Sequence, residues 1–181
     1  MSDPTIAAEA HPSVGRAATI ATVVLLLDQA TKALVVNAWR PNSQGVEVIP
    51  GFFRLVHFRN RGGAWGMLSE YPWGLTIFSI IAIFFIVLRY RHLVEGSMLR
   101  SLFLALIFGG ILGNLADRLL RGAVVDFLYF SLGKYNWPAF NVADSAICIG
   151  VFGFILASLS EPQDDAPNED AAGKPVKGGT D

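Results

Sequence analysis

The apolar positions of the chain fall into four long runs separated by polar stretches. The runs cover residues 17–36, 72–90, 100–120 and 139–159. A helix needs about 20 mostly apolar residues to cross the roughly 30 Å hydrocarbon core of a bilayer. Each run is close to that length, so the pattern predicts four transmembrane helices. Four crossings would leave both chain ends on the same side of the membrane.

The stretches outside these runs differ from one another in composition. Residues 1–16 are polar, and residues 161–181 are acidic and poor in apolar side chains, so we predict a disordered lead and a disordered tail. Residues 46–49 and 52–58 are short β-prone runs around Pro-Gly, which predict a small sheet or hairpin at the membrane surface. The glycines of residues 60–67 are compatible with tight turns and close backbone approach, and equally with a simple flexible turn.

Composition supports a membrane protein and narrows its function. The chain is 52% hydrophobic and 16% charged, whereas a soluble domain is about a quarter charged. Its net charge of −1 gives no basic patch for nucleic acid. A single cysteine, Cys148, excludes an intramolecular disulfide, and we predict that it is a buried small apolar side chain. The histidines show no ligand spacing, so we predict neither a metal nor a cofactor.

Polar residues gather where the third run ends and the fourth begins. The third run carries Asn114, Asp117, Arg118 and Arg121 at the spacing i, i+3, i+4, i+7. The fourth repeats this spacing with Asn141, Asp144, Ser145 and Cys148. Each set shares one helix face. Ionisable groups are costly to expose to lipid, so we predict that both faces look into the helix bundle.

Asp126 and Asp144 lie on either side of the connection between these two runs. Helices joined by a short connection are antiparallel neighbours, so the two carboxyl groups should reach the same depth. Two close carboxylates share a proton. Such a pair can activate water with one group and protonate a leaving amine with the other, without a metal. Donors from Asn114, Arg118 and Asn141 would then orient the pair or hold a substrate carbonyl.

Other interpretations of these aspartates remain open. Asp144 could be the acidic residue that follows an N-cap at Asn141 and stabilises the helix start. Asp126 could be a loop carboxylate that pairs with Arg121 or Lys134. Neither interpretation explains the polar residues on the facing third run.

Asp28 and Lys32 stand four residues apart in the first run and share a helix face. They could be a mutually screened pair with the lysine reaching outward to the surface, or they could belong to the active site. A serine–lysine mechanism with Ser131 and Lys134 is disfavoured because Lys134 lies in a polar loop, where a lysine keeps its proton.

Two other protein classes fit the polar pattern less well. A proton-coupled transporter would distribute polar groups along the depth of several spans, but the second run offers only Thr76 and Ser79. A purely structural bundle would not need paired carboxylates.

For a metal-free aspartate pair, we expect thiol, serine and metal-chelating reagents to leave the activity intact.

Five sequence blocks resemble one known family. They are DQATK (28–32), NRGGAWG (60–66), GNLADR (113–118), VVDF (124–127) and FNVADS (140–145). In this order and at these span ends, they resemble the bacterial lipoprotein signal peptidases (signal peptidase II). The resemblance covers residues from about 17 to 160 and implies a single membrane peptidase domain of that extent.

The resemblance implies an aspartic endopeptidase that removes signal peptides from diacylglyceryl-modified prolipoproteins, on the N-terminal side of the lipidated cysteine. Asp126 and Asp144 match its catalytic aspartates. The positions matching its substrate-binding residues, several of which contact the inhibitor globomycin, are Asn60, Asn114, Arg118 and Asn141. The positions tied to stability or site architecture are Asp28, Lys32 and Asp117.

The resemblance also implies a fold and a location. We expect a mainly α membrane protein, a four-helix bundle with an extracytoplasmic β-cradle at about residues 40–71 and a short amphipathic helix at 64–71. Both termini would be cytoplasmic, and the active site would face the outer side of the bacterial inner membrane. We expect a monomer that contacts membrane lipid, its lipidated substrate and globomycin-like inhibitors, but no nucleic acid.

Overall fold

Four helices form the body of the protein. The structure, a computed structural model, describes residues 12–62 and 72–160. The helices are α1 (Val14–Ala38), α2 (Pro72–Val94), α3 (Met98–Arg121) and α4 (Val142–Ser160). Within these described ranges, four helices are long and apolar enough to cross a membrane. The prediction of a mainly α membrane protein with four transmembrane helices is confirmed.

The starts of two helices differ from the predicted spans. Helix α1 begins at Val14, so the end of the predicted disordered lead is helical, because Ser13 adopts the N-cap position and its carbonyl accepts the N–H of Ala17. Helix α4 begins at Val142 and not at residue 139. Phe140 instead forms an isolated β-bridge with Leu128, which keeps the chain extended up to the helix start.

Apolar side chains cover the outside of the helices, and polar side chains fill the inside at one end. Leu34, Phe78 and Phe152 are 71%, 68% and 67% exposed. The fully buried side chains at the polar end include Asp28, Lys32, Asp117 and Asn141, each 0% exposed. This arrangement reverses the usual distribution of a soluble protein. It is the one expected when lipid, rather than water, surrounds the bundle.

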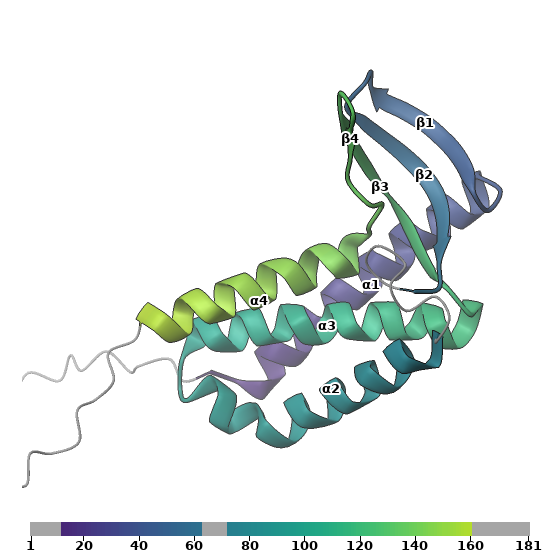
Figure 1. The fold of residues 1–181 in the computed structure, drawn as a ribbon. Coiled ribbons are helices and arrows are strands. Elements are labelled where there is room, and N and C mark those ends of the chain that lie inside the picture. Colours follow the sequence, from purple (N-terminus) through teal and green to yellow (C-terminus); the bar gives the residue numbers. More distant parts are fainter. Residues whose placement is uncertain (1–11, 63–71, 161–181) are drawn as a thin grey trace, which may run out of the picture.

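Helix α3 is the centre of the bundle. It contacts α1, α2 and α4, and Figure 1 shows it between α4 and α2 with α1 crossing behind. Glycines allow α1 to approach closely. A Cβ atom at Gly109 would lie 2.7 Å from the Ala21 carbonyl oxygen, and one at Gly113 would lie 2.5 Å from Oδ2 of Asp28. Gly109 and Gly113 therefore form a small-residue face of α3 that packs against α1.

An antiparallel sheet rises from the end of the bundle where α1 ends and α4 begins (Figure 1). Its strands are β1 (Ser43–Ile49), β2 (Phe53–Asn60), β3 (Val124–Leu132) and β4 (Tyr135–Asn136), in the order β1-β2-β3-β4. The β1–β2 hairpin agrees with the predicted β-prone runs. The sheet is larger than the predicted segment 40–71, because half of its strands come from the connection between α3 and α4.

Strand β3 rules out the alternative in which Asp126 is a loop carboxylate. The segment Val124–Leu132 is rich in β-branched and aromatic residues, which favour a strand. It pairs antiparallel with β2, and this register places Phe58 opposite Asp126 and Asn60 opposite Val124. The backbone at Asp126 is therefore fixed by its pairing with β2, and it is not part of a flexible connection. The predicted amphipathic helix at 64–71 lies outside the described residues.

Candidate active site

One cavity of about 520 Å³ brings together most of the predicted site residues. The predicted residues on its wall are Asn60 from β2, Asn114 and Arg118 from α3, Asp126 from β3 and Asp144 from α4. Asn141 is fully buried beside the cavity and contacts Asp126 and Asn114. Residues from distant parts of the chain thus converge at the end of the bundle next to the sheet.

Asp126 is buried and receives a hydrogen bond on each carboxylate oxygen. The Asn141 side-chain amide donates to Oδ1 at 2.7 Å, and the Asn60 side-chain amide donates to Oδ2 at 2.9 Å. Burial and, to a smaller extent, the nearby Asp144 carboxylate raise the pKa of Asp126 to about 7. Hydrogen bonds from the two asparagines act in the opposite direction. The alternative ion pair with Arg121 or Lys134 is absent among the described contacts of Asp126.

Asp144 occupies the first turn of α4 and forms a reciprocal cap with Asn141. The Asp144 backbone N–H donates to Oδ1 of Asn141 at 2.9 Å, and the Asn141 backbone N–H donates to Oδ2 of Asp144 at 3.2 Å. This is a capping-box arrangement with an aspartate at the third helical position. The side-chain amide of Asn114 donates to the other oxygen, Oδ1, at 2.7 Å. The capping interpretation and the active-site interpretation of Asp144 are therefore both compatible with the geometry.

The amide orientations of two asparagines are fixed by neighbouring donors. Oδ1 of Asn60 accepts the backbone N–H of Gly62 at 2.9 Å, and Oδ1 of Asn141 accepts the backbone N–H of Asp144. A backbone N–H can only donate. Each amide must therefore turn its NH₂ group away from that donor and toward Asp126.

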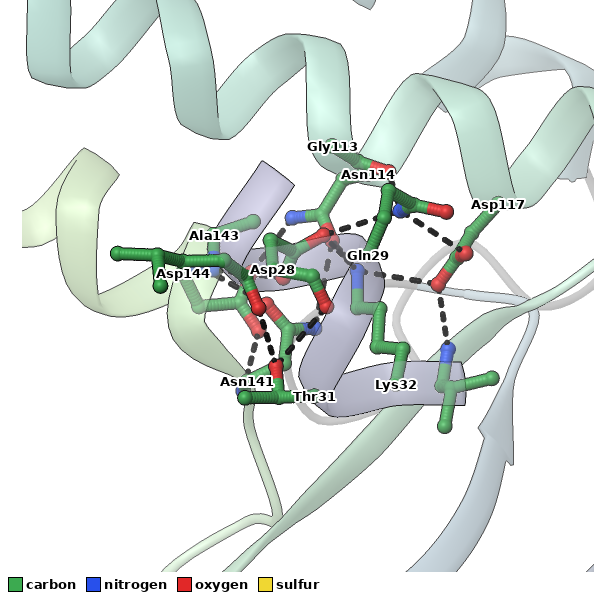
Figure 2. Close-up of polar contacts among 12 residues, drawn as sticks. Asp28, Gln29, Thr31, Lys32, Gly113, Asn114, Asp117, Asn141, Ala143 and Asp144 are labelled. Atoms are coloured by element: carbon green, nitrogen blue, oxygen red, sulfur yellow. Dashed lines mark hydrogen bonds and ion pairs between the residues drawn. The ribbon is translucent and has the colours of Figure 1, made fainter. Parts of the chain in front are cut away.

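Behind the cavity lies a fully buried network around Lys32. The Lys32 ammonium contacts Oδ2 of Asp28 at 2.8 Å and Oδ2 of Asp117 at 3.0 Å. It also donates to Oδ1 of Asn114 at 3.0 Å. Figure 2 shows the lysine among these side chains, between α1 and α3. The alternative in which Lys32 reaches outward to the membrane surface is wrong, because neighbouring carboxylates provide its charge with partners inside the protein.

Comparison with known sequences identifies the family of the chain. The sequence model of the Peptidase_A8 family, described as signal peptidase (SPase) II, matches residues 20–160. The chain belongs to the signal peptidase II family.

Individual relatives match this chain over most of their own length. A lipoprotein signal peptidase of Nitratidesulfovibrio vulgaris is 44% identical over 156 residues, which cover 83% of this chain and 93% of the relative. One of Syntrophotalea carbinolica is 43% identical over 141 residues, covering 76% and 87%.

Two solved structures are also similar to the chain. Both are described as bacterial membrane enzyme structures, at 2.3 and 1.9 Å resolution. The first has a TM-score of 0.76 and 33% identity, covering 92% of this chain and 98% of the other. The second has a TM-score of 0.74 and 34% identity, covering 84% and 97%. The membrane fold and the protease family are thus supported by independent comparisons.

In this member of the signal peptidase II family, sequence reasoning missed Gln29. Its Nε2 donates to Asp28 at 3.1 Å and to Asp117 at 3.3 Å, and its Oε1 accepts from Arg121 at 2.9 Å. Gln29 is uncharged and follows Asp28 directly, so only the contact between α1 and α3 shows its role. Its position inside the DQATK block was the one available signal.

The structure also corrects the prediction for Cys148. The thiol is exposed rather than buried, and Cys148 lies on the wall of the cavity one helical turn after Asp144. Helix α4 packs on α3 through the face that carries Gly150 and Gly153, which differs from the face that carries Cys148. Cys148 is therefore turned away from that packing surface.

Proposed function

We propose that this protein is an aspartic endopeptidase that removes signal peptides from diacylglyceryl-modified prolipoproteins. The cut would fall on the N-terminal side of the lipidated cysteine. The observation that carries this proposal is the shared cavity wall of Asp126 and Asp144, with hydrogen-bond donors on both carboxyl groups. Membership of the signal peptidase II family supports the substrate class.

In the proposed reaction, one carboxylate of the pair removes a proton from a water molecule as the water attacks the scissile carbonyl. The other carboxyl group holds a proton in the resting enzyme. The raised pKa of Asp126, near 7, suits it to hold that proton at neutral pH. Collapse of the tetrahedral intermediate then transfers a proton to the departing amine and releases the new carboxyl terminus. The balanced result is hydrolysis of one peptide bond.

The neighbouring polar residues would divide the remaining work. The amides of Asn114 and Asn141 already donate to Asp144 and Asp126, so we propose that they orient the pair. Arg118 lies on the cavity wall, and its guanidinium is 3.5 Å from the Ser79 hydroxyl. It is the cation placed to face a substrate carbonyl or a developing negative charge. Asn60, which already donates a hydrogen bond to Asp126, would also bind substrate.

The location follows from the same proposal. We propose that the protein lies in the bacterial inner membrane with both termini cytoplasmic and with the sheet and cavity on the outer side. A lipidated substrate would then reach the cavity from the outer membrane leaflet. We further propose that the protein acts as a monomer and that globomycin-like cyclic peptides compete for this cavity.

The deciding experiment is cleavage of a diacylglyceryl-modified prolipoprotein by the purified enzyme in detergent or lipid. Asp126→Asn and Asp144→Asn should each abolish the product band while the protein keeps its helical circular-dichroism spectrum. Glu47→Gln is a matched control, because Glu47 is a carboxylate that pairs with Arg54 on the sheet, outside the cavity. It should cleave at the normal rate.

Near-normal cleavage by either aspartate variant would refute the two-aspartate mechanism. The same assay tests the substrate class, because the unmodified prolipoprotein should be cleaved far more slowly than the lipidated form. Equal cleavage of both forms would refute the requirement for diacylglyceryl.

A further inference from the structure

The backbone next to each candidate catalytic aspartate is held by a second carboxylate. Oδ2 of Asp117 accepts the N–H of Val125 at 3.0 Å, and Val125 immediately precedes Asp126. Oδ1 of Asp28 accepts the N–H of Ala143 at 2.9 Å, and Ala143 immediately precedes Asp144. Hydrogen bonds to charged groups are stronger than neutral ones. The positions of β3 and α4 at the cavity therefore depend on where these two carboxylates stand.

Lys32 joins the two supporting carboxylates. Its ammonium lies 2.8 Å from Oδ2 of Asp28 and 3.0 Å from Oδ2 of Asp117. The side chain is fully buried, so water does not screen these contacts and the geometry is tightly fixed. A continuous path thus runs from β3 through Asp117, Lys32 and Asp28 to α4 (Figure 2).

The third N–H group of the Lys32 ammonium affects Asp144 indirectly, through Asn114. Lys32 donates to Oδ1 of Asn114 at 3.0 Å. Because an ammonium has donors and no acceptor, the amide oxygen of Asn114 must face the lysine. The NH₂ group then faces the opposite way, where it donates to Oδ1 of Asp144 at 2.7 Å. All three N–H groups of the ammonium are thereby used.

We infer that Lys32 is a positioning residue, which sets the separation of Asp126 and Asp144 and the direction of the Asn114 hydrogen bond. This inference rests on the proposed function of the aspartate pair. Lys32 is absent from the cavity wall, so it does not touch substrate. It contacts Asp28, Asp117 and Asn114 and acts on the pair through these contacts and through its charge, so its loss should impair the chemical step more than substrate binding.

The lysine also supplies the pair with a buried positive charge. Among residues 12–62 and 72–160, the charged groups that act on the pair are Asp28 and Lys32 on α1, and Asp117 and Arg118 on α3. Helix α2 contributes Ser79, which is uncharged, and β2 contributes Asn60. Lys32 lowers the pKa of Asp126, against the larger effect of burial. Removal of the lysine should therefore move the pH–rate profile to higher pH, since Asp126 would hold its proton more firmly.

Lys32→Met tests the inference in the lipidated-prolipoprotein assay. We expect kcat to fall on the order of a hundredfold, as for a small displacement of catalytic groups, while KM stays within about threefold. We also expect the profile of kcat against pH to move to higher pH. A purely structural role would lower the amount of folded enzyme without moving this profile.

A second variant guards against loss of folding. Lys32→Met leaves two buried carboxylates with less compensation, which costs stability. The double variant Asp28→Asn/Lys32→Met avoids this problem. The amide introduced at position 28 retains an oxygen for the N–H of Ala143, and Asp117 keeps its ion pair with Arg121. This variant should fold, and it should show the same loss of kcat and the same pH shift.

Arg121→Gln is the matched control. Arg121 pairs with the same carboxylate, Asp117, but its described side-chain contacts include neither Asn114 nor the aspartate pair. The control should unfold at a lower temperature, yet its kcat and pH profile should match those of the wild type.

Two results would overturn the inference. One is a folded Asp28→Asn/Lys32→Met enzyme with wild-type kcat and an unmoved pH profile. The other is an equal loss and shift in Arg121→Gln, which would assign the effect to the network as a whole. Neither result affects the proposed two-aspartate mechanism, which fails if Asp126→Asn or Asp144→Asn remains active.

Discussion

Asn141 donates a 2.7 Å hydrogen bond from its side-chain amide to Asp126, while its amide oxygen caps the helix that carries Asp144. One side chain therefore serves both members of the pair. Its nitrogen contacts the strand-borne aspartate, and its oxygen fixes the start of α4. These two roles can be separated by substitution.

Asn141→Ser should keep the helix cap and lose the amide donor, because serine is a good N-cap residue with no NH₂ group. We expect kcat to fall on the order of a hundredfold with little change in the unfolding temperature. Asn141→Ala removes both roles and should cost a further ~1 kcal/mol of stability. Parallel activity assays and thermal unfolding in detergent check this prediction. Equal unfolding temperatures for the two variants would contradict the capping role.

The stability of the protein should depend on pH through Asp126. The folded protein keeps this carboxyl protonated up to about pH 7, whereas the unfolded chain loses the proton near pH ~4. Folding therefore takes up a proton between these values, and the free energy of unfolding falls as the pH rises through this window. The upper bound of the change is about 4 kcal/mol.

Thermal unfolding from pH 4 to pH 8 measures this effect. Asp126→Asn cannot titrate and should show a smaller decrease in unfolding temperature with rising pH than the wild type. The quantity to compare is the change in unfolding temperature per pH unit. The absolute unfolding temperature of Asp126→Asn also reflects the new amide, which would face two amide donors. Identical slopes would contradict the raised pKa.

Gly113 is where the close packing of α3 on α1 meets the buried charge network. A Cβ at this position would lie 2.5 Å from Oδ2 of Asp28, so Gly113→Ala must displace the carboxylate that holds Ala143. We expect a loss of roughly 2 kcal/mol of stability from overpacking, together with lower activity. Gly74→Ala is the control, because nothing lies within 4 Å of a Cβ there. Thermal unfolding and cleavage assays should separate the two variants.

Cys148 changes the expectation that thiol reagents leave the activity intact. The thiol is exposed on the cavity wall one turn after Asp144. A bulky, membrane-permeant maleimide should therefore inhibit cleavage by filling part of the cavity, and a methylthio group should inhibit far less. Cys148→Ala should be fully active and resistant to both reagents. Inhibition of this variant by the maleimide would show that the reagent acts elsewhere.

The sequence predicted those features that depend on local spacing. The run lengths identified the four helices, and the repeated i, i+3, i+4 spacing put Asn114, Asp117 and Arg118 on one inward face. The position of Asp144 in the first turn of α4 agrees with the N-cap spacing from Asn141. Local periodicity suffices here because each helix is long and the polar residues of the site recur at helical spacing.

The features that escaped prediction depend on contacts between distant parts of the chain. Strand β3 follows α3 closely and resembles a connection, because its partner β2 lies more than 60 residues earlier in the sequence. Burial of Lys32 depends on Asp117 in another helix, so an i, i+4 pattern with Asp28 could not distinguish it from a lysine that reaches the surface. Gln29 is uncharged, and its hydrogen bond to Asp117 forms only because α1 packs against α3.

The placement of Asp126 on a strand and Asp144 on a helix has a consequence for biogenesis. The sheet needs the segment between the first two helices and the segment between the last two, and the strands pair only after both have reached the same side of the bilayer. A partly inserted chain therefore lacks a complete aspartate pair. In the proposed mechanism, the enzyme would therefore gain peptidase activity only when its own membrane insertion is finished.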